Sequence, residues 1–98
     1  MPGYRLTNAA KDDLRRIYLR GIQDFGEAKA DAYFYALIRR FEEIAESPLQ
    51  YPAIDIIRTG YRRSLMGQDS IYYWIDGETV EITAVLGRQD HERWLKGG

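Results

Sequence analysis

The feature that most limits how this chain can fold is the stretch from Gly60 to Asp90, which reads as three β-strands joined by two tight turns. Asp76-Gly77 separates two runs that are rich in β-branched and aromatic residues. This dipeptide strongly indicates a two-residue hairpin turn, because both of its residues tolerate positive φ angles. With Asp76-Gly77 at the centre of the turn, Tyr73 is predicted to lie opposite Val80. The sequence therefore predicts antiparallel strands in the C-terminal half of the chain.

Side chains alternate between the two faces of a strand, so this register sorts the hairpin residues into two sets. The predicted core face is formed by Ile71, Tyr73, Ile75, Val80, Ile82, Ala84 and Leu86. The opposite face is formed by Tyr72, Trp74, Thr79, Glu81, Thr83 and Val85. Because Tyr72 and Trp74 are large aromatic residues, we expect the second face to be covered, either by this chain or by a partner.

Two helices are predicted before the sheet. Thr7 can cap the first, and Gly26 ends it. The buried stripe of this helix is predicted at Ala10, Leu14, Ile17, Tyr18, Gly21, Ile22 and Phe25. The second helix is predicted from Glu27 to Glu46. Since the connection between them is so short, the two helices must form an antiparallel hairpin.

With a short strand at Tyr4 to Leu6, the predicted order is β-α-α-β-β-β. This is an α+β fold in which a helical hairpin packs on a small antiparallel sheet. Residues 1–98 make one domain, with a short tail at residues 90–98. No run approaches the ~20 apolar residues that cross a bilayer, and no signal peptide is evident. We therefore expect a cytoplasmic protein without a membrane partner.

The composition argues against several kinds of function. There is no cysteine, and His91 is the only histidine, so a zinc site lacks ligands and we expect neither a metal nor a cofactor. The formal net charge is −1, which disfavours direct, sequence-specific binding of nucleic acid. The sequence also lacks a phosphate-binding glycine loop and a nucleophile motif. No catalytic residue is therefore predicted.

Residues spread along the chain resemble a known family. In order they are Leu6-Thr7, Ala10, Asp13-Leu14, Ile17, Phe25-Gly26, Ala30, Tyr33, Leu37, Phe41, Ala45, Pro48, Ile57-Arg58, Gly60-Tyr61-Arg62-Arg63, Ile71-Tyr72-Tyr73 and Val80-Glu81-Ile82. The chain resembles the ParE branch of the RelE/ParE toxin superfamily from Tyr4 to about Asp90. The run from Arg58 to Arg63, followed by an Ile-x-Tyr strand, is the most specific part of the resemblance.

The resemblance implies the toxin of a type II toxin–antitoxin pair with a RelE/ParE-like fold. Toxins of this branch are neutralised by a ParD-like antitoxin, and we expect a hetero-oligomer, a heterotetramer or larger. The branch is associated with the poisoning of DNA gyrase, whereas the RelE branch cuts messenger RNA on the ribosome. This chain departs from the ParE pattern at Asp69, Ala84 and Gly87, where ParE-like sequences often carry a histidine and further basic residues.

Three functions remain open at this point. The first is a ParE-like toxin, not an enzyme, that inhibits gyrase by binding. The second is a ribosome-dependent endoribonuclease, for which His91 is the only candidate base and Arg62, Arg63 and Arg88 are the candidate cations. The third is an inactive homologue that only binds its antitoxin. The single candidate base and the balanced charge favour the first.

Two sets of binding residues are predicted. Apolar side chains that the predicted fold leaves uncovered should bind the antitoxin, and these are Leu19, Ala32, Tyr35, Ala36, Tyr72 and Trp74. An amphipathic antitoxin helix in the hairpin groove, followed by an extended segment on the sheet, would cover them. The residues predicted to bind the target are Arg62, Arg88, Gln89, Asp90, Arg93 and Trp94. Arginine and aromatic residues are common anchors of interfaces.

Overall fold

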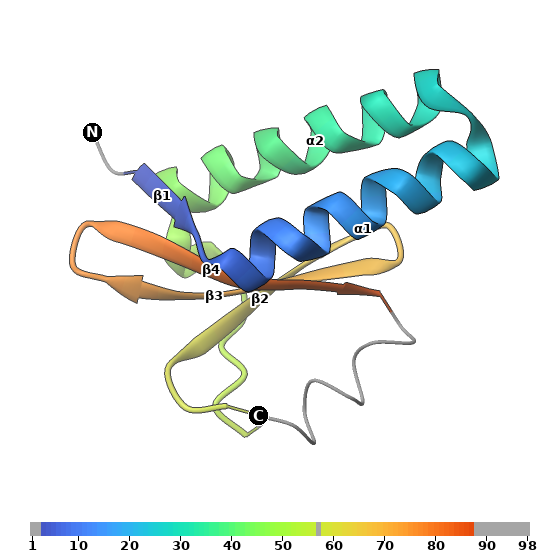
Figure 1. Ribbon diagram of the computed structural model, residues 1–98. Coiled ribbons are helices and arrows are strands. Elements are labelled where there is room, and N and C mark those ends of the chain that lie inside the picture. The colour runs from blue at the N-terminus through green and yellow to red at the C-terminus, as the bar shows by residue number, and fades with distance from the viewer. Residues whose placement is uncertain (1–2, 57, 88–98) are drawn as a thin grey trace.

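The computed structural model describes residues 3–56 and 58–87 of the chain. Its elements in chain order are β1 (Gly3–Leu6), α1 (Asn8–Phe25), α2 (Glu27–Glu46), a 3-10 helix η1 (Pro48–Gln50), β2 (Tyr61–Met66), β3 (Asp69–Asp76) and β4 (Thr79–Gly87). The two helices form a hairpin on one face of the sheet (Figure 1). The predicted β-α-α-β-β-β order and the α+β fold class are confirmed.

The four strands form one sheet in the order β1-β4-β3-β2. Strands β2, β3 and β4 are antiparallel, as predicted, but β1 runs parallel to β4. The sheet is therefore mixed rather than wholly antiparallel. Parallel neighbours need a long connection, and here both helices and two further strands separate β1 from β4 in the chain. Among the described residues no helix is both long and apolar enough to cross a membrane.

The turn between β3 and β4 differs from the prediction by one residue. Asp76 pairs with Thr79, so Gly77 and Glu78 are the two central residues. Gly77 has a φ of 64°, and no described residue other than glycine has a positive φ. A turn with glycine alone at its first central position matches the type II′ hairpin, whereas the predicted turn needed a positive φ at Asp76 as well.

This change moves every pairing in the hairpin but preserves the faces next to the turn. Tyr73 lies opposite Ile82 instead of Val80. Because each partner moves by two residues, and side chains alternate with a period of two, the same residues still face the helices. Tyr73, Val80 and Ile82 are accordingly buried in the main core.

A bulge in β4 inverts the faces beyond Ile82. Tyr73 pairs with Ile82 but Tyr72 pairs with Ala84, so Thr83 is an extra residue in the strand. The predicted faces of Ala84, Val85 and Leu86 were wrong for this reason. Val85 lies in the main core under the helices, and the other two join Ile54 and Tyr72 in a second cluster.

The first turn of α1 is bonded to this bulge. The Thr7 hydroxyl accepts a hydrogen bond from the Ala10 backbone N–H at 3.1 Å, as predicted for a helix cap, and donates one to the Thr83 carbonyl at 3.2 Å. The Asp13 carboxylate accepts a bond from the Val85 N–H at 3.0 Å. The Thr83 carbonyl and the Val85 N–H lie beyond the point where β1 stops pairing with β4. Thr7 and Asp13, at the start of α1, therefore supply their hydrogen-bond partners.

Candidate partner-binding surface

A groove lies beneath the closed end of the helical hairpin. In Figure 1 this end projects beyond the β2–β3 turn and beyond the end of β4. The groove has a volume of about 830 Å³. Its lining residues come from both helices, from the β2–β3 turn and from the end of β4: Ile17, Tyr18, Arg20, Gly21, Asp24, Phe25, Lys29, Ala30, Tyr33, Phe34, Leu37, Gln68, Asp69 and Gly87.

The helices supply an apolar wall to this groove. Ile17, Phe34 and Leu37 continue the stripe that packs on the sheet elsewhere in the hairpin. At the mouth of the groove, Phe25 is 68% exposed, so its predicted place in a buried stripe was wrong. Phe25 is exposed because the closed end of the hairpin extends past the strands (Figure 1), so no described strand covers its side chain. Exposed apolar surface of this kind usually marks an interface.

Small residues bring the two helices together beside the groove. A Cβ atom on Gly21 would lie 3.3 Å from the Cβ of Ala30, closer than most such contacts. The Tyr18 hydroxyl donates a hydrogen bond across the hairpin to Asp31 at 2.5 Å, and its ring meets Phe34 edge-on. The bond to Asp31, followed by desolvation, raises the pKa of Tyr18 to about 12.

The β2–β3 turn is held against α2 by Tyr33. The Tyr33 hydroxyl lies 2.6 Å from a carboxylate oxygen of Asp69 and 3.1 Å from the carbonyl of Met66. Burial, and then the bond to Asp69, raise the pKa of Tyr33, so the hydroxyl stays protonated and acts as a donor. A Cβ on Gly67, whose φ is +59°, would lie 3.4 Å from the Tyr33 oxygen. Asp69 therefore helps to hold the β2–β3 turn, which forms the floor of the groove, against α2.

The helix residues predicted to bind an antitoxin are exposed, but none of them lines the groove. Ala32, Tyr35 and Ala36 lie on α2, and Tyr35 is 70% exposed. The Tyr35 ring contacts the ring of Phe34, with centroids 6.0 Å apart, so Tyr35 borders the groove. Leu19 is 55% exposed on α1.

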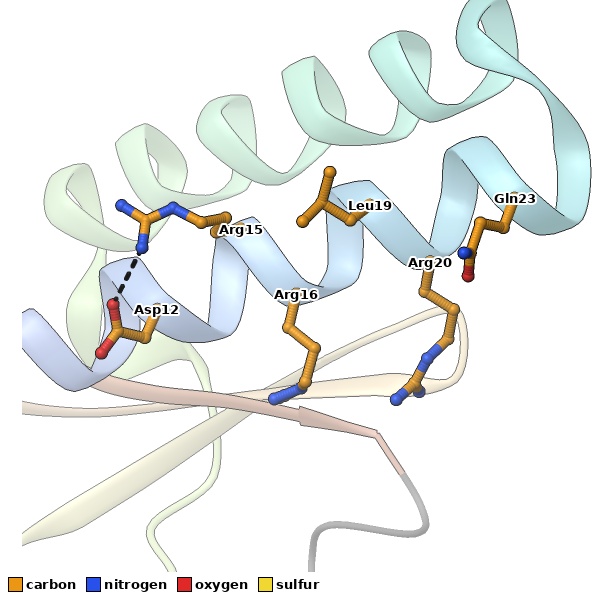
Figure 2. Close-up of a pocket in the computed structure, with 6 residues that line it drawn as sticks. All are labelled: Asp12, Arg15, Arg16, Leu19, Arg20 and Gln23. Carbon is orange, nitrogen blue, oxygen red and sulfur yellow. Dashed lines mark hydrogen bonds and ion pairs between the residues drawn. The ribbon is translucent and has the colours of Figure 1, made fainter.

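Leu19 lies in a second hollow of about 390 Å³ that is formed by α1 alone and shares Arg20 with the groove. The other residues that line it are Asp12, Arg15, Arg16, Arg20 and Gln23. Figure 2 shows Arg16 and Arg20 extending from α1 toward the sheet, whereas Arg15 is paired with Asp12. The six predicted antitoxin residues therefore do not form one continuous surface.

On the outer face of the sheet the prediction for Tyr72 was wrong. Tyr72 is fully buried, because Ile54 and the bulged end of β4 pack against it. Trp74 is half-buried, and its indole N–H donates a hydrogen bond to Glu81 at 2.9 Å. The bonds that Glu81 accepts from Trp74 and then from Arg5 lower the pKa of its carboxyl group. Of the two aromatic residues, only Trp74 has exposed surface for a partner.

Of the predicted target-binding residues, only Arg62 lies within the described part of the chain. It shares the helix-facing side of the sheet with its partner Tyr73 and donates a hydrogen bond to the Tyr51 carbonyl at 2.6 Å. Arg62 therefore holds the segment after η1 in place. Arg88, Gln89, Asp90, Arg93 and Trp94 lie outside the described residues, as does His91.

Several lining residues were missed by sequence reasoning, among them Phe25, Tyr33 and Phe34. Each was assigned to an apolar stripe and assumed to be covered by the sheet. The element lengths gave no signal, because the 18- and 20-residue helices and the nine-residue strand all span about 27–30 Å at ~1.5 Å per helical residue and ~3.3 Å per strand residue. Among the described residues no group of three or more His, Cys, Asp or Glu side chains could hold a metal ion.

The sequence places this chain among the ParE toxins of the RelE/ParE superfamily. Residues 4–92 match the family model of the ParE toxin of the type II toxin–antitoxin system parDE. Toxin ParE1 of Caulobacter vibrioides is 36% identical over 93 residues, which cover 95% of this chain and 96% of that protein. Toxin ParE1 of Mycobacterium tuberculosis is 32% identical over 94 residues, covering 94% and 96%. The chain belongs to the ParE toxin family.

Solved structures share this fold. A chain from the chromosomal ParDE system of P. aeruginosa superposes with a TM-score of 0.78 at 18% identity, over 89% of this chain and 96% of that one. A chain of the toxin–antitoxin complex RelBE2 from Mycobacterium tuberculosis has a TM-score of 0.63 at 22% identity, over 90% and 100%. At these identities the likeness shows the fold alone.

Proposed function

We propose that this ParE-type toxin arrests growth by binding DNA gyrase in the cytoplasm, and that a ParD-like antitoxin neutralises it. The observation that carries this proposal is the match to the ParE family over residues 4–92. The groove beneath the hairpin supports the part that concerns the antitoxin. Of the residues we predict to bind gyrase, Arg62 lies on β2, and the others lie outside the described residues.

The groove has the size and chemistry of a site for an amphipathic helix. An α-helix is ~10 Å in diameter, so 830 Å³ corresponds to on the order of two helical turns. The apolar wall formed by Ile17, Phe34 and Phe25 would bury the apolar face of such a helix. Trp74 lies on the other face of the sheet, where an extended segment of the same antitoxin could reach it.

The chemistry of the groove favours binding over catalysis. Tyr18 and Tyr33 have raised pKa values and remain protonated at neutral pH, so neither can act as a general base there. Asp69 accepts the hydrogen bond of Tyr33. We therefore propose that the protein is not an enzyme and that it acts through contacts alone.

The test of this function is induction of the toxin in cells that lack its antitoxin. Filamentous growth with an SOS response is the expected result, and co-expression of ParD-like antitoxins identifies the one that restores growth. The purified toxin should also inhibit DNA supercoiling by purified gyrase. Rapid arrest of translation would contradict the proposal in favour of the endoribonuclease, and normal growth would favour an inactive homologue.

A substitution at His91 separates the two active alternatives. His91→Ala should leave toxicity nearly unchanged if no proton is transferred. A ribonuclease that loses its only base should lose ~10²–10⁴-fold in rate. Toxicity lost in a variant that still folds and still binds the antitoxin would support the ribonuclease. Deleting the residues after Asp90 should abolish toxicity while antitoxin binding persists.

A further inference from the structure

We propose that three charged side chains on the rim of the groove, Arg20, Asp24 and Lys29, determine which antitoxin helix the groove accepts. This inference rests on the proposed role of the groove as the antitoxin site, and it adds the charge pattern of the partner. The three residues line the groove and are exposed. Arg20 and Asp24 come from α1, and Lys29 comes from the first turn of α2.

The rim charges form no ion pair within the described chain, unlike several other charges on the helices. Elsewhere charges pair three residues apart: Arg15 with Asp12 at 3.4 Å, Arg16 with Asp13 at 3.3 Å, and Arg40 with Glu43 at 3.2 Å. Arg20 and Asp24 are one turn apart, a spacing that allows an ion pair. Nevertheless, neither they nor Lys29 form an ion pair with any residue that the structure describes. All three charges are therefore available to a bound helix.

Among the described residues that line the groove, the fourth charged group, Asp69, is already engaged. Asp69 accepts a hydrogen bond from Tyr33 at the floor. Figure 2 shows Arg20 extending from α1 toward the sheet side, the side on which the groove lies. The charged side chains that can select a partner therefore come from the two helices. Asp69 instead holds the β2–β3 turn, the floor of the groove, against α2.

Apolar and charged groups have different effects on recognition. Burial of apolar surface is non-directional, so the wall formed by Ile17 and Phe34 would accept many amphipathic helices. Charges on a rim discriminate, because a like charge placed opposite them disfavours the wrong partner. The affinity of the groove would come from its wall, and its selectivity from Arg20, Asp24 and Lys29.

The positions of the three charges define the partner. Asp24 and Lys29 lie near the closed end of the hairpin, and Arg20 lies one turn farther from it. The flank of the antitoxin helix that faces α1 should carry an acidic residue opposite Arg20 and a basic residue opposite Asp24. The flank that faces α2 should carry an acidic residue opposite Lys29. This pattern also sets the direction in which the helix lies.

The first experiment uses the antitoxin that restores growth in the co-expression test. Calorimetric titration should show that Arg20→Glu, Asp24→Lys and Lys29→Glu each weaken the complex by about tenfold or more. Arg39→Glu is the matched control, because Arg39 is exposed on α2 and does not line the groove. Reversing the opposing charge of the antitoxin should restore affinity to the matching variant. Rim variants that bind as Arg39→Glu does, or a failure of the charge swap to restore binding, would overturn the proposal.

A second experiment does not depend on finding an antitoxin. Two synthetic helical peptides share one leucine-lined face, and one has the predicted flank charges while the other has all of them reversed. The first should bind the wild-type toxin at least about tenfold more tightly. Equal affinities would overturn the role of the rim. If no ParD-like antitoxin neutralises the toxin, the proposed function fails, and the peptide result still decides the role of the rim.

Discussion

At the scale of single residues, Thr7 shows how one side chain links a helix to a strand. Its hydroxyl caps α1 at Ala10 and bonds the carbonyl of Thr83, the extra residue of the β4 bulge. The cap was predictable because its partner is three residues away. The bond to Thr83 was not, because the two residues are far apart in the sequence and meet only when β1 lies beside β4.

Replacing Thr7 tests this double role. Thr7→Val should lower the free energy of unfolding by about 1–2 kcal/mol, because the cap and the bond to Thr83 are both lost. Thr7→Ser keeps the hydroxyl and should recover most of this loss. Urea denaturation measures both variants. Equal stability of the valine and serine variants would show that the hydroxyl bonds contribute nothing.

Tyr73 makes the stability sensitive to alkaline pH. Burial raises its pKa to about 12 from the ordinary value of 10.0. Between these two values the unfolded chain has lost a proton that the folded protein keeps, so the free energy of unfolding should fall as the pH rises, by up to ~1.4 kcal/mol per unit. Below pH 10 this contribution is fully present.

Tyr73→Phe should remove this part of the pH dependence, so the loss of stability from pH 10 to 12 should be shallower in that variant. The exposed Tyr35, changed to Phe, is the control and should keep the wild-type slope. Denaturation at a series of pH values gives the comparison. Parallel curves for wild type and Tyr73→Phe would contradict the assignment.

At the scale of elements, the helical hairpin is closed by a contact between small residues. Gly21 faces Ala30, and a Cβ added to the glycine would lie only 3.3 Å from that of the alanine. A large side chain here must push α1 and α2 apart. Because both helices form a wall of the groove, its shape depends on this contact.

Gly21→Leu should therefore lower the free energy of unfolding by about 2 kcal/mol through overpacking and should also weaken antitoxin binding. Gly21→Ala should change stability little, because its gain in helix propensity opposes a mild clash. Ala32→Leu places a similar side chain on the exposed side of α2 and serves as the control for stability. Wild-type stability in the Gly21→Leu variant would show that the helices can separate without cost.

At the scale of the whole molecule, the helices project beyond the sheet and leave an apolar face uncovered. Phe25 is 68% exposed at the mouth of the groove, and Leu49, in the middle of η1, is 70% exposed outside it. The two residues are thus equally exposed to water but differ in their relation to the groove. This difference makes them a matched pair for testing which surface binds the antitoxin.

Phe25→Glu should weaken the antitoxin complex by about 2 kcal/mol, or roughly thirtyfold in Kd, if Phe25 is an anchor of the interface. Leu49→Glu should leave the affinity unchanged, although it introduces the same charge at an equally exposed position. Calorimetric titration of both variants gives the answer. Equal effects of the two substitutions on the affinity would show that the groove is not part of the antitoxin interface.

The sequence by itself determined the elements of this protein and much of its core, because helical and strand periodicities, caps and glycine turns are local properties. The hairpin of α1 and α2 and the core positions of Tyr73 and Ile82 were predictable for that reason. The tertiary structure alone decided the bulge at Thr83, which reverses the following residues, and the burial of Tyr72 beneath Ile54. It also decided the groove, since an apolar stripe is equally apolar whether or not a strand lies beneath it. Where the sheet ends under the helices depends on contacts between residues that are distant in the chain.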